Sequence, residues 1–221
     1  MKVTWFFILG FVGIVSSQTQ AQVHDAGSWI SVTIQKKINK KNSILLSEEV
    51  RLNENYTEAG NIFTELGYQY KLSKRIDVTL ALRYANKQQL ENSYSQRLRY
   101  MLTTKYTHFL SKKITINARL RWQQQWNDIP QSSTLKTLDS QLRVGAGADC
   151  QTSKKISIGC FAETFYEIKP PLLLTTRYTV AATYYFNKQQ SIELGGVNQY
   201  SHNEYNPSID WVTTISYKYK W

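Results

Sequence analysis

The stretch that decides the fold is Ile76-Asp77-Val78-Thr79-Leu80-Ala81-Leu82-Arg83-Tyr84. Its even-numbered residues are apolar, and its odd-numbered residues are small or charged. A period of two places the two sets on opposite faces of a β-strand, whereas a helix would repeat every 3.6 residues or so. The stretch therefore predicts a strand with one apolar and one polar face.

The same alternation recurs along the chain. From Ile114 to Trp122, and again around Leu98 and Leu142, apolar residues alternate with arginine, asparagine or glutamine. We expect eleven strands, near residues 28–37, 43–53, 61–71, 76–86, 94–109, 114–126, 136–150, 156–167, 175–186, 191–199 and 208–221. Ordinary globular domains average roughly 20–25% strand, so this much strand favours a closed all-β barrel.

The links between these strands are of two kinds. Short basic turns such as Leu72-Ser73-Lys74-Arg75, Leu110-Ser111-Lys112-Lys113 and Thr152-Ser153-Lys154-Lys155 alternate with longer links such as residues 127–134. This is the arrangement of a hairpin meander with two different ends, which is typical of outer-membrane barrels. Since the last strand of such a barrel delivers its C-terminus to the periplasm, we expect the short turns on that side.

The N-terminal residues indicate export. Lys2 precedes an apolar run from Trp5 to Val15, and small residues lead up to Ala21. This is the pattern of a secretory signal peptide, and its apolar part is too short to span a bilayer. We expect residues 1–21 to be removed and residues 22–221 to form a single domain. No later segment is apolar enough for a transmembrane helix, which leaves a closed barrel as the way to cross a membrane.

The C-terminal strand favours a membrane barrel over a soluble one. Tyr217, Tyr219 and Trp221 share a face, and the chain ends on an aromatic residue. This resembles the signal by which outer-membrane barrels are delivered to the barrel assembly machinery. Tyrosine and tryptophan also gather near the strand ends, as interfacial girdles do. We therefore predict a closed antiparallel up-and-down transmembrane β-barrel in the bacterial outer membrane.

The odd strand number conflicts with this prediction. Single-chain bacterial barrels have an even number of strands. We therefore expect about twelve strands, with the missing one in a longer link or near Gln22 to Ala26, and ten as the second choice.

Several short motifs resemble the family called domain of unknown function 2490. They are Trp29-Ile30-Ser31, Lys40-Lys41-Asn42-Ser43-Ile44, Glu48-Glu49-Val50-Arg51-Leu52, Gly67-Tyr68-Gln69-Tyr70, the Leu-Ser-Lys-Lys hairpin and the aromatic C-terminus. The resemblance covers nearly the whole mature chain. It implies a small barrel of Gram-negative outer membranes, and it transfers no activity and no catalytic residue.

The polar face should line the lumen with a charge network. Its members are Arg51, Arg83, Arg97, Arg99, Arg119, Arg121, Arg143, Arg177, Glu49, Glu65, Asp77, Asp139 and Glu163, with Glu193 and Asp210 on the same face. The two signs are nearly balanced, so we expect ion pairs that plug a narrow barrel. The alternative is a weakly anion-preferring pore lined by the four arginines from Arg97 to Arg121. Glu48 breaks the alternation, and we expect a bulge there.

Composition excludes several functions. The formal charge is +11, but export makes a nucleic-acid partner implausible, and outer-membrane lipid and lipopolysaccharide are the expected surroundings. Cys150 and Cys160 flank one turn on the outward face; we expect free thiols, with a disulfide as the alternative. Three histidines and no metal or phosphate motif predict no cofactor and no enzyme. A structural or interaction barrel is favoured over a narrow passive pore, with a lipid-acting enzyme as a distant alternative. The sequence identifies no particular solute or protein partner.

Overall fold

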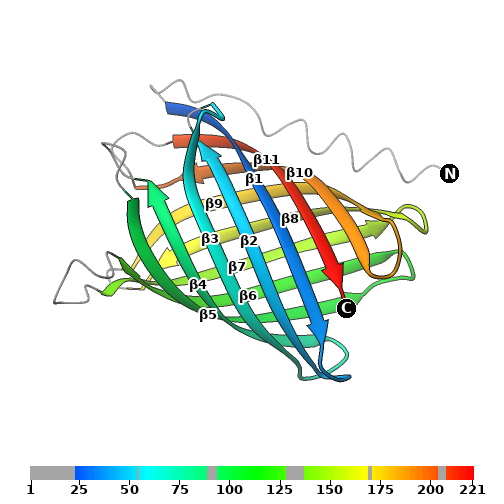
Figure 1. Cartoon of the computed structure of the whole chain (residues 1–221). Helices are drawn as coiled ribbons and strands as arrows, with labels where there is room; N and C mark the ends of the chain where they lie inside the picture. Colours follow the sequence, from blue (N-terminus) through cyan, green and yellow to red (C-terminus); the bar gives the residue numbers. More distant parts are fainter. Residues whose placement is uncertain (1–22, 54, 89–93, 128–136, 169–170, 204–207) are drawn as a thin grey trace.

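Eleven strands form one closed barrel in the computed structural model, which describes residues 23–53, 55–88, 94–127, 137–168, 171–203 and 208–221 (Figure 1). The predicted signal peptide lies outside the described residues and stays a prediction. The strands are β1 (Val23–Lys37), β2 (Asn42–Asn53), β3 (Glu58–Lys71), β4 (Ile76–Gln88), β5 (Tyr94–Phe109), β6 (Ile114–Asn127), β7 (Thr137–Gln151), β8 (Ile156–Glu167), β9 (Leu172–Tyr185), β10 (Gln190–Ser201) and β11 (Ser208–Lys220). Among these residues, no helix is long and apolar enough to cross a membrane.

The barrel closes through a parallel pair of strands. Each strand pairs antiparallel with its neighbours in the chain, but β1 and β11 run in the same direction, from Val23 opposite Ser208 to Gln35 opposite Lys220. In a meander, strand direction alternates, so the first and last of eleven strands must be parallel. The all-β closed barrel is confirmed, with eleven strands against the expected number of about twelve. All eleven predicted strands form the wall, and residues 23–26 form the start of β1.

The seam between β1 and β11 leaves no open sheet edge. Its pairing continues to the last residue, because the Trp221 N–H donates to the Gln35 carbonyl at 2.7 Å and the Lys37 N–H donates to the Trp221 carbonyl at 2.9 Å. A membrane barrel requires such closure, since an unpaired backbone edge would lie in hydrocarbon. Parallel pairing of β1 with β11 therefore closes this barrel. In barrels with an even number of strands, antiparallel pairing of the first and last strands does the same.

The short basic turns owe their repeated sequence to backbone capping. In three of them, the serine hydroxyl accepts the N–H groups of the residues two and three positions further on, at 3.0–3.3 Å, from Ser73, Ser111 and Ser153. Asn39 and Asn187 cap their turns in the same way. All of these turns lie at the end of the barrel where β11 finishes (Figure 1). The two ends predicted from the links are therefore real, and we call them the turn end and the loop end.

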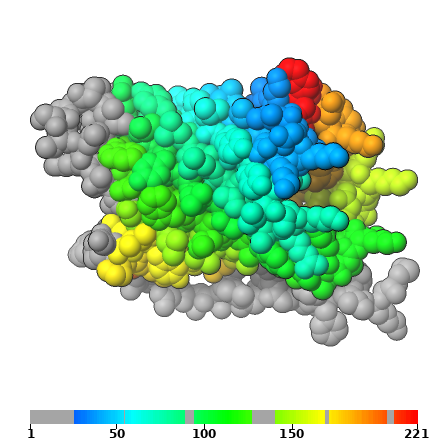
Figure 2. All heavy atoms as spheres, turned by 90° about the horizontal axis from the view of Figure 1, so that it is seen from below, coloured from blue at the N-terminus to red at the C-terminus, as the bar shows by residue number. Residues whose placement is uncertain are grey.

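The outer face of the wall is apolar and exposed. On β4, Leu80 and Leu82 are 57% and 48% exposed. Ala81, which lies between them, and Ala85, which lies further along the strand, are buried. Figure 2 shows one flank of the barrel, over which consecutive strands follow one another. Large apolar residues turned outward over a whole wall match a hydrocarbon environment and not water.

Glu48 lies on this outer face. It is exposed, and Thr64 donates a hydrogen bond to its Oε1 at 2.8 Å. The bulge expected at this position is absent from the described pairings, because the register of β2 with β3 shifts between Arg51 and Leu52 instead. The prediction of a bulge at Glu48 is therefore wrong, and a carboxyl group lies on the apolar face.

The two cysteines are free and exposed on the same outer face. Cys150 pairs in register with Ile158, and Cys160 pairs with Ala148, so the thiols lie two positions out of register on neighbouring strands. A directly opposite placement, which a short cross-strand bridge would favour, is not available to them.

Candidate functional site

The lumen is the candidate site, because the polar face of every strand turns inward. The eight predicted arginines alternate with the outward apolar residues of β2, β4, β5, β6, β7 and β9. Glu49, Glu65 and Glu163 share that inner face with them. The position of Asp139 is described only as part of β7, at a bulge opposite β6, and its side chain lies outside the description.

Glu163 holds two arginines at the middle of the barrel. Its Oε1 lies 2.8 Å from Nη2 of Arg119 on β6, and its Oε2 is bound by Arg143 on β7. The Glu163 side chain is 1% exposed and that of Arg143 is 8% exposed, whereas that of Arg119 is 30% exposed. One buried carboxylate therefore neutralises charge from two neighbouring strands.

Gly145 explains how Arg119 reaches across a strand. Gly145 lies between Arg119 and Glu163 in the register of β6, β7 and β8. A Cβ atom at Gly145 would lie 2.5 Å from the Phe161 ring, and one at Gly147 would lie 2.6 Å from it. The two glycines thus form a recess that holds this ring, over which the Arg119 guanidinium stacks at 4.5 Å.

Arginines and aromatic rings alternate around the inner wall. The Arg143 guanidinium lies 4.0 Å from the Phe165 ring, and that of Arg177 lies 4.7 Å from both Phe165 and Trp29. Arg51 continues the series, 4.1 Å from Trp29 and 5.2 Å from the Phe63 ring. Each such contact contributes roughly 0.5–2 kcal/mol, depending on desolvation. The rings hold the guanidinium groups in place without supplying an opposite full charge.

Two further carboxylates have one arginine each. Glu65 accepts from Arg83 Nη2 at 2.6 Å across β3 and β4, and the Arg83 guanidinium also covers Phe63 at 3.7 Å. Glu49 accepts from Arg51 Nε at 2.6 Å within β2. These pairs, with the Glu163 cluster, form the charged part of the barrel's middle.

Arg99, Arg121 and Arg177 meet neutral acceptors instead. Arg99 donates from Nε to the Gln125 amide oxygen at 2.8 Å, and Arg121 donates to Thr103 Oγ1 at 2.8 Å. Arg177 donates from Nε to the Gln199 amide oxygen at 3.1 Å. Arg97 also has partners, Ser95 Oγ at 3.4 Å among them.

Within the Arg97 to Arg121 group, Arg119 contacts a carboxylate, whereas Arg99 and Arg121 contact neutral acceptors. Of the four arginines, Arg119 has Glu163 as a carboxylate partner among the ion pairs of the described residues. Asp77 lies instead at the turn end of β4, opposite Lys71 and Lys105. The predicted network has nearly equal numbers of each sign, but tilt and stagger separate the two signs along the axis, so positive charge exceeds negative charge at mid-barrel.

Side chains fill the middle of the lumen, and we call this packed level the waist. Met101, Glu163, Phe63 and Val197 are 1%, 2%, 3% and 3% exposed. These residues face inward and are covered by other inward side chains, as the Arg51 and Arg83 guanidinium groups cover the Phe63 ring. One cavity lies on either side of this level.

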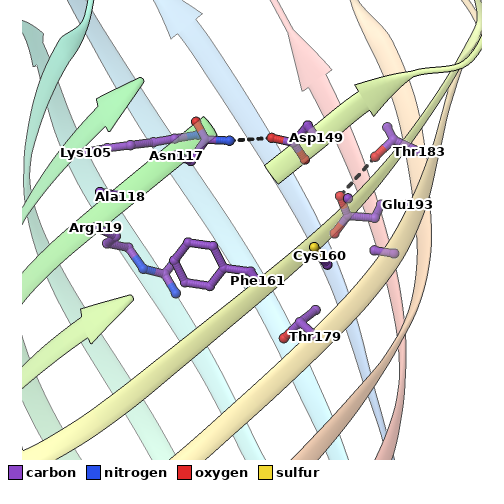
Figure 3. Close-up of a pocket in the computed structure, with 12 residues that line it drawn as sticks. Lys105, Asn117, Ala118, Arg119, Asp149, Cys160, Phe161, Thr179, Thr183 and Glu193 are labelled. Atoms are coloured by element: carbon purple, nitrogen blue, oxygen red, sulfur yellow. Dashed lines mark hydrogen bonds between the residues drawn. The ribbon is translucent and has the colours of Figure 1, made fainter. Parts of the chain in front are cut away.

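The cavity toward the turn end, the turn-side vestibule, has a volume of about 200 Å³ (Figure 3). Its charged lining residues are Lys105, Arg119, Asp149 and Glu193. Asn117 donates to Asp149, and Thr183 donates to Glu193 at 3.0 Å, as the dashed lines in Figure 3 mark. Two cationic and two anionic side chains leave this vestibule balanced.

The cavity toward the loop end, the loop-side vestibule, is larger, about 340 Å³. Five cationic side chains line it against one carboxylate, Asp210; they are Arg51, Lys87, Arg97, Arg99 and Arg177. Trp29 and Gln199 complete the part of the lining that contacts these cations. The two ends of the lumen therefore differ in charge.

The predicted assembly residues lie at the seam and not in the lumen. Tyr217 pairs in register with Val32, and Tyr219 with Ile34, on the outer face of β1 and β11. The Trp221 ring lies beneath Lys36 Nζ at 4.2 Å. The described residues contain no group of three or more His, Cys, Asp or Glu that could hold a metal ion. His202 is engaged by Thr176 at 2.8 Å.

Sequence reasoning missed the aromatic part of the waist. Trp29, Phe63, Phe161 and Phe165 occupy polar-face positions, and Phe161 and Phe165 flank Glu163. An apolar ring at an inward position next to a carboxylate was the available signal. It is too large for an open, solvated lumen and therefore indicates a packed one.

Comparison with known proteins identifies the family and the fold. A family model described as protein of unknown function (DUF2490) matches residues 26–209. No curated protein matches the sequence. A solved structure named NanC porin aligns with a TM-score of 0.52 at 10% identity, covering 89% of this chain and 99% of that one. A second structure, KdgM porin in complex with disordered oligogalacturonate, aligns with a TM-score of 0.49 at 12% identity, covering 79% and 90%. At 10% identity, the likeness to the NanC porin structure shows the fold alone, a closed β-barrel.

Proposed function

This chain belongs to the DUF2490 family, and we propose that it is an outer-membrane barrel that is closed at rest and acts by binding or interaction. The porin-like fold and the apolar outer face support a transmembrane barrel. The packed waist supports a closed one. We propose no catalytic role for it.

One observation carries this proposal: Glu163, at mid-barrel, is buried between Arg119 and Arg143. A water-filled pore would solvate a carboxylate at that depth, because polar side chains line open barrels and contact water. Here the space is filled by the Phe165 and Phe63 rings stacked on arginines. Steady ion flow would require these groups to move apart.

Conductance in planar bilayers tests the proposal. The refolded wild-type protein should show little or no steady current. The Phe63→Ala and Phe165→Ala double variant should conduct, because it removes two rings that fill the waist. Phe186→Ala and Phe109→Ala, at exposed positions, are matched controls and should remain closed. Stable open currents from the wild type would overturn the closed barrel.

A narrow anion-preferring pore is the second candidate, favoured by the excess of arginine over carboxylate at the waist. The same recordings separate the two. The Arg119→Ala and Arg121→Ala double variant should lose heat resistance if the network plugs the barrel. Unchanged heat resistance together with wild-type anion-selective currents that weaken in the variant would establish the pore.

We further propose two partners for the outer surface. Outer-membrane lipid and lipopolysaccharide would surround the apolar wall, and the barrel assembly machinery would engage Tyr217, Tyr219 and Trp221. The aromatic residues at the completed seam support the second of these.

A further inference from the structure

The two vestibules differ in the balance of their charges, and packing of the waist does not require this difference. The turn-side vestibule has two cationic and two anionic side chains, whereas the loop-side vestibule has five cationic side chains and one carboxylate. A structural ion-pair network would keep both ends balanced. Concentrated charge of one sign in a concave, low-dielectric cavity instead raises the local concentration of ligands of opposite sign.

We propose that the loop-side vestibule binds a compact ligand with two or more anionic groups, carboxylates or phosphates. The proposal gives a ligand class to the binding role above and rests on it. The cavity lies on the loop-end side of the waist, so the ligand would enter from that side of the membrane.

Two guanidinium groups of this vestibule, those of Arg99 and Arg177, are positioned by neutral acceptors, whereas Arg51 is paired with Glu49. Arg99 and Arg177 donate to the amide oxygens of Gln125 and Gln199, which carry no full charge. Planar guanidinium groups bind carboxylates and phosphates through two parallel hydrogen bonds, which makes them suited to such ligands. An incoming anion could replace a neutral acceptor at these arginines without breaking an existing ion pair.

Trp29 is a positioning residue in this site. Its ring lies 4.1 Å from the Arg51 guanidinium and 4.7 Å from that of Arg177, on neighbouring parts of the vestibule wall. Stacking limits the directions in which these groups can point, and a preorganised site loses less entropy on binding. Trp29 thereby holds two cationic groups facing the same cavity.

The cavity size limits the ligand. A volume of about 340 Å³ is near the lower end of ligand pockets, which run from roughly 300 to 1,000 Å³. A di- or tricarboxylate, or a sugar-sized molecule with several acidic groups, fits this space. The closed waist would stop a longer chain from passing further.

Binding to the refolded full chain in detergent tests the proposal. Citrate and pyrophosphate are the probes, measured by titration calorimetry, with glucose as the neutral control. Citrate, pyrophosphate or both should bind and glucose should not; a preference between the two probes distinguishes carboxylate from phosphate ligands. Affinity should fall steeply with added salt, since exposed charge attraction is screened.

Matched variants locate the site. Lys87→Gln with Arg99→Gln removes two of the five charges of the loop-side vestibule and should weaken binding at least about tenfold. Lys105→Gln removes one charge of the turn-side vestibule and should leave binding unchanged. Trp29→Leu should weaken binding while every charge remains. Migration of each unheated variant as a folded barrel on SDS gels, with the wild-type resistance to unfolding on heating, verifies that it is folded.

The outcomes separate this inference from the proposed function. No binding of either anion, or equal weakening by Lys105→Gln, overturns the vestibule site and leaves a closed barrel intact. Anion binding by a wild type that conducts steadily overturns the closed barrel and keeps the site.

Discussion

Replacing Glu163 by glutamine removes a buried carboxylate that two arginines share. Arg143, whose side chain is 8% exposed, would then be left with the Phe165 ring and an amide. Breaking a buried ion pair on one side costs about 3–5 kcal/mol, because the remaining charge stays desolvated. Arg119 adds less, since its side chain is 30% exposed and water can screen it. We therefore expect Glu163→Gln to lower the free energy of unfolding by about 3–4 kcal/mol.

Urea unfolding of the refolded barrel, followed by tryptophan fluorescence, measures this loss. Glu65→Gln is the matched control, because Glu65 has one arginine partner and is 22% exposed. Its loss should be smaller, about 1–2 kcal/mol, since water reaches this pair. Equal losses for the two variants, or a Glu163→Gln barrel as stable as the wild type, would refute the assignment of Glu163 as the centre of the waist.

Three further predictions concern the wall and its ends. Deleting Trp221 should cause periplasmic degradation and loss from the outer membrane, seen by fractionation; normal membrane levels would contradict its role in assembly. An epitope inserted at Thr57, at the loop end, should be reached by antibody on whole cells, and one at Lys112 should not; reversed labelling would invert the orientation. Glu48→Leu should raise the free energy of unfolding by about 1–2 kcal/mol, since it removes a carboxyl group from the lipid-facing surface, while Thr64→Val, which removes its hydrogen-bond donor, should lower it. A Glu48→Leu barrel that unfolds at a lower urea concentration than the wild type would show that Glu48 is not in contact with hydrocarbon.

The inward and outward faces of each strand could be predicted from the sequence, because the alternation of polar and apolar residues is local. From Ile76 to Tyr84, the inward and outward sets follow from the geometry of one extended chain, and the exposed Leu80 and Leu82 confirm them. The short turns were equally local, because Ser73 caps a backbone only two and three residues away. The family resemblance was also present in these short segments, and the match over residues 26–209 confirms it.

The way in which the barrel closes, and the side chains that meet at its waist, could be seen only in the tertiary structure. The sequence showed eleven strands but not that β1 could pair in parallel with β11, since that contact joins opposite ends of the chain. Likewise, Glu163 binds Arg119 across an intervening strand only because Gly145 has no side chain and the register aligns all three. Alternation fixes which side chains face inward. The stagger between strands decides how far along the axis each one lies, and therefore which charges meet.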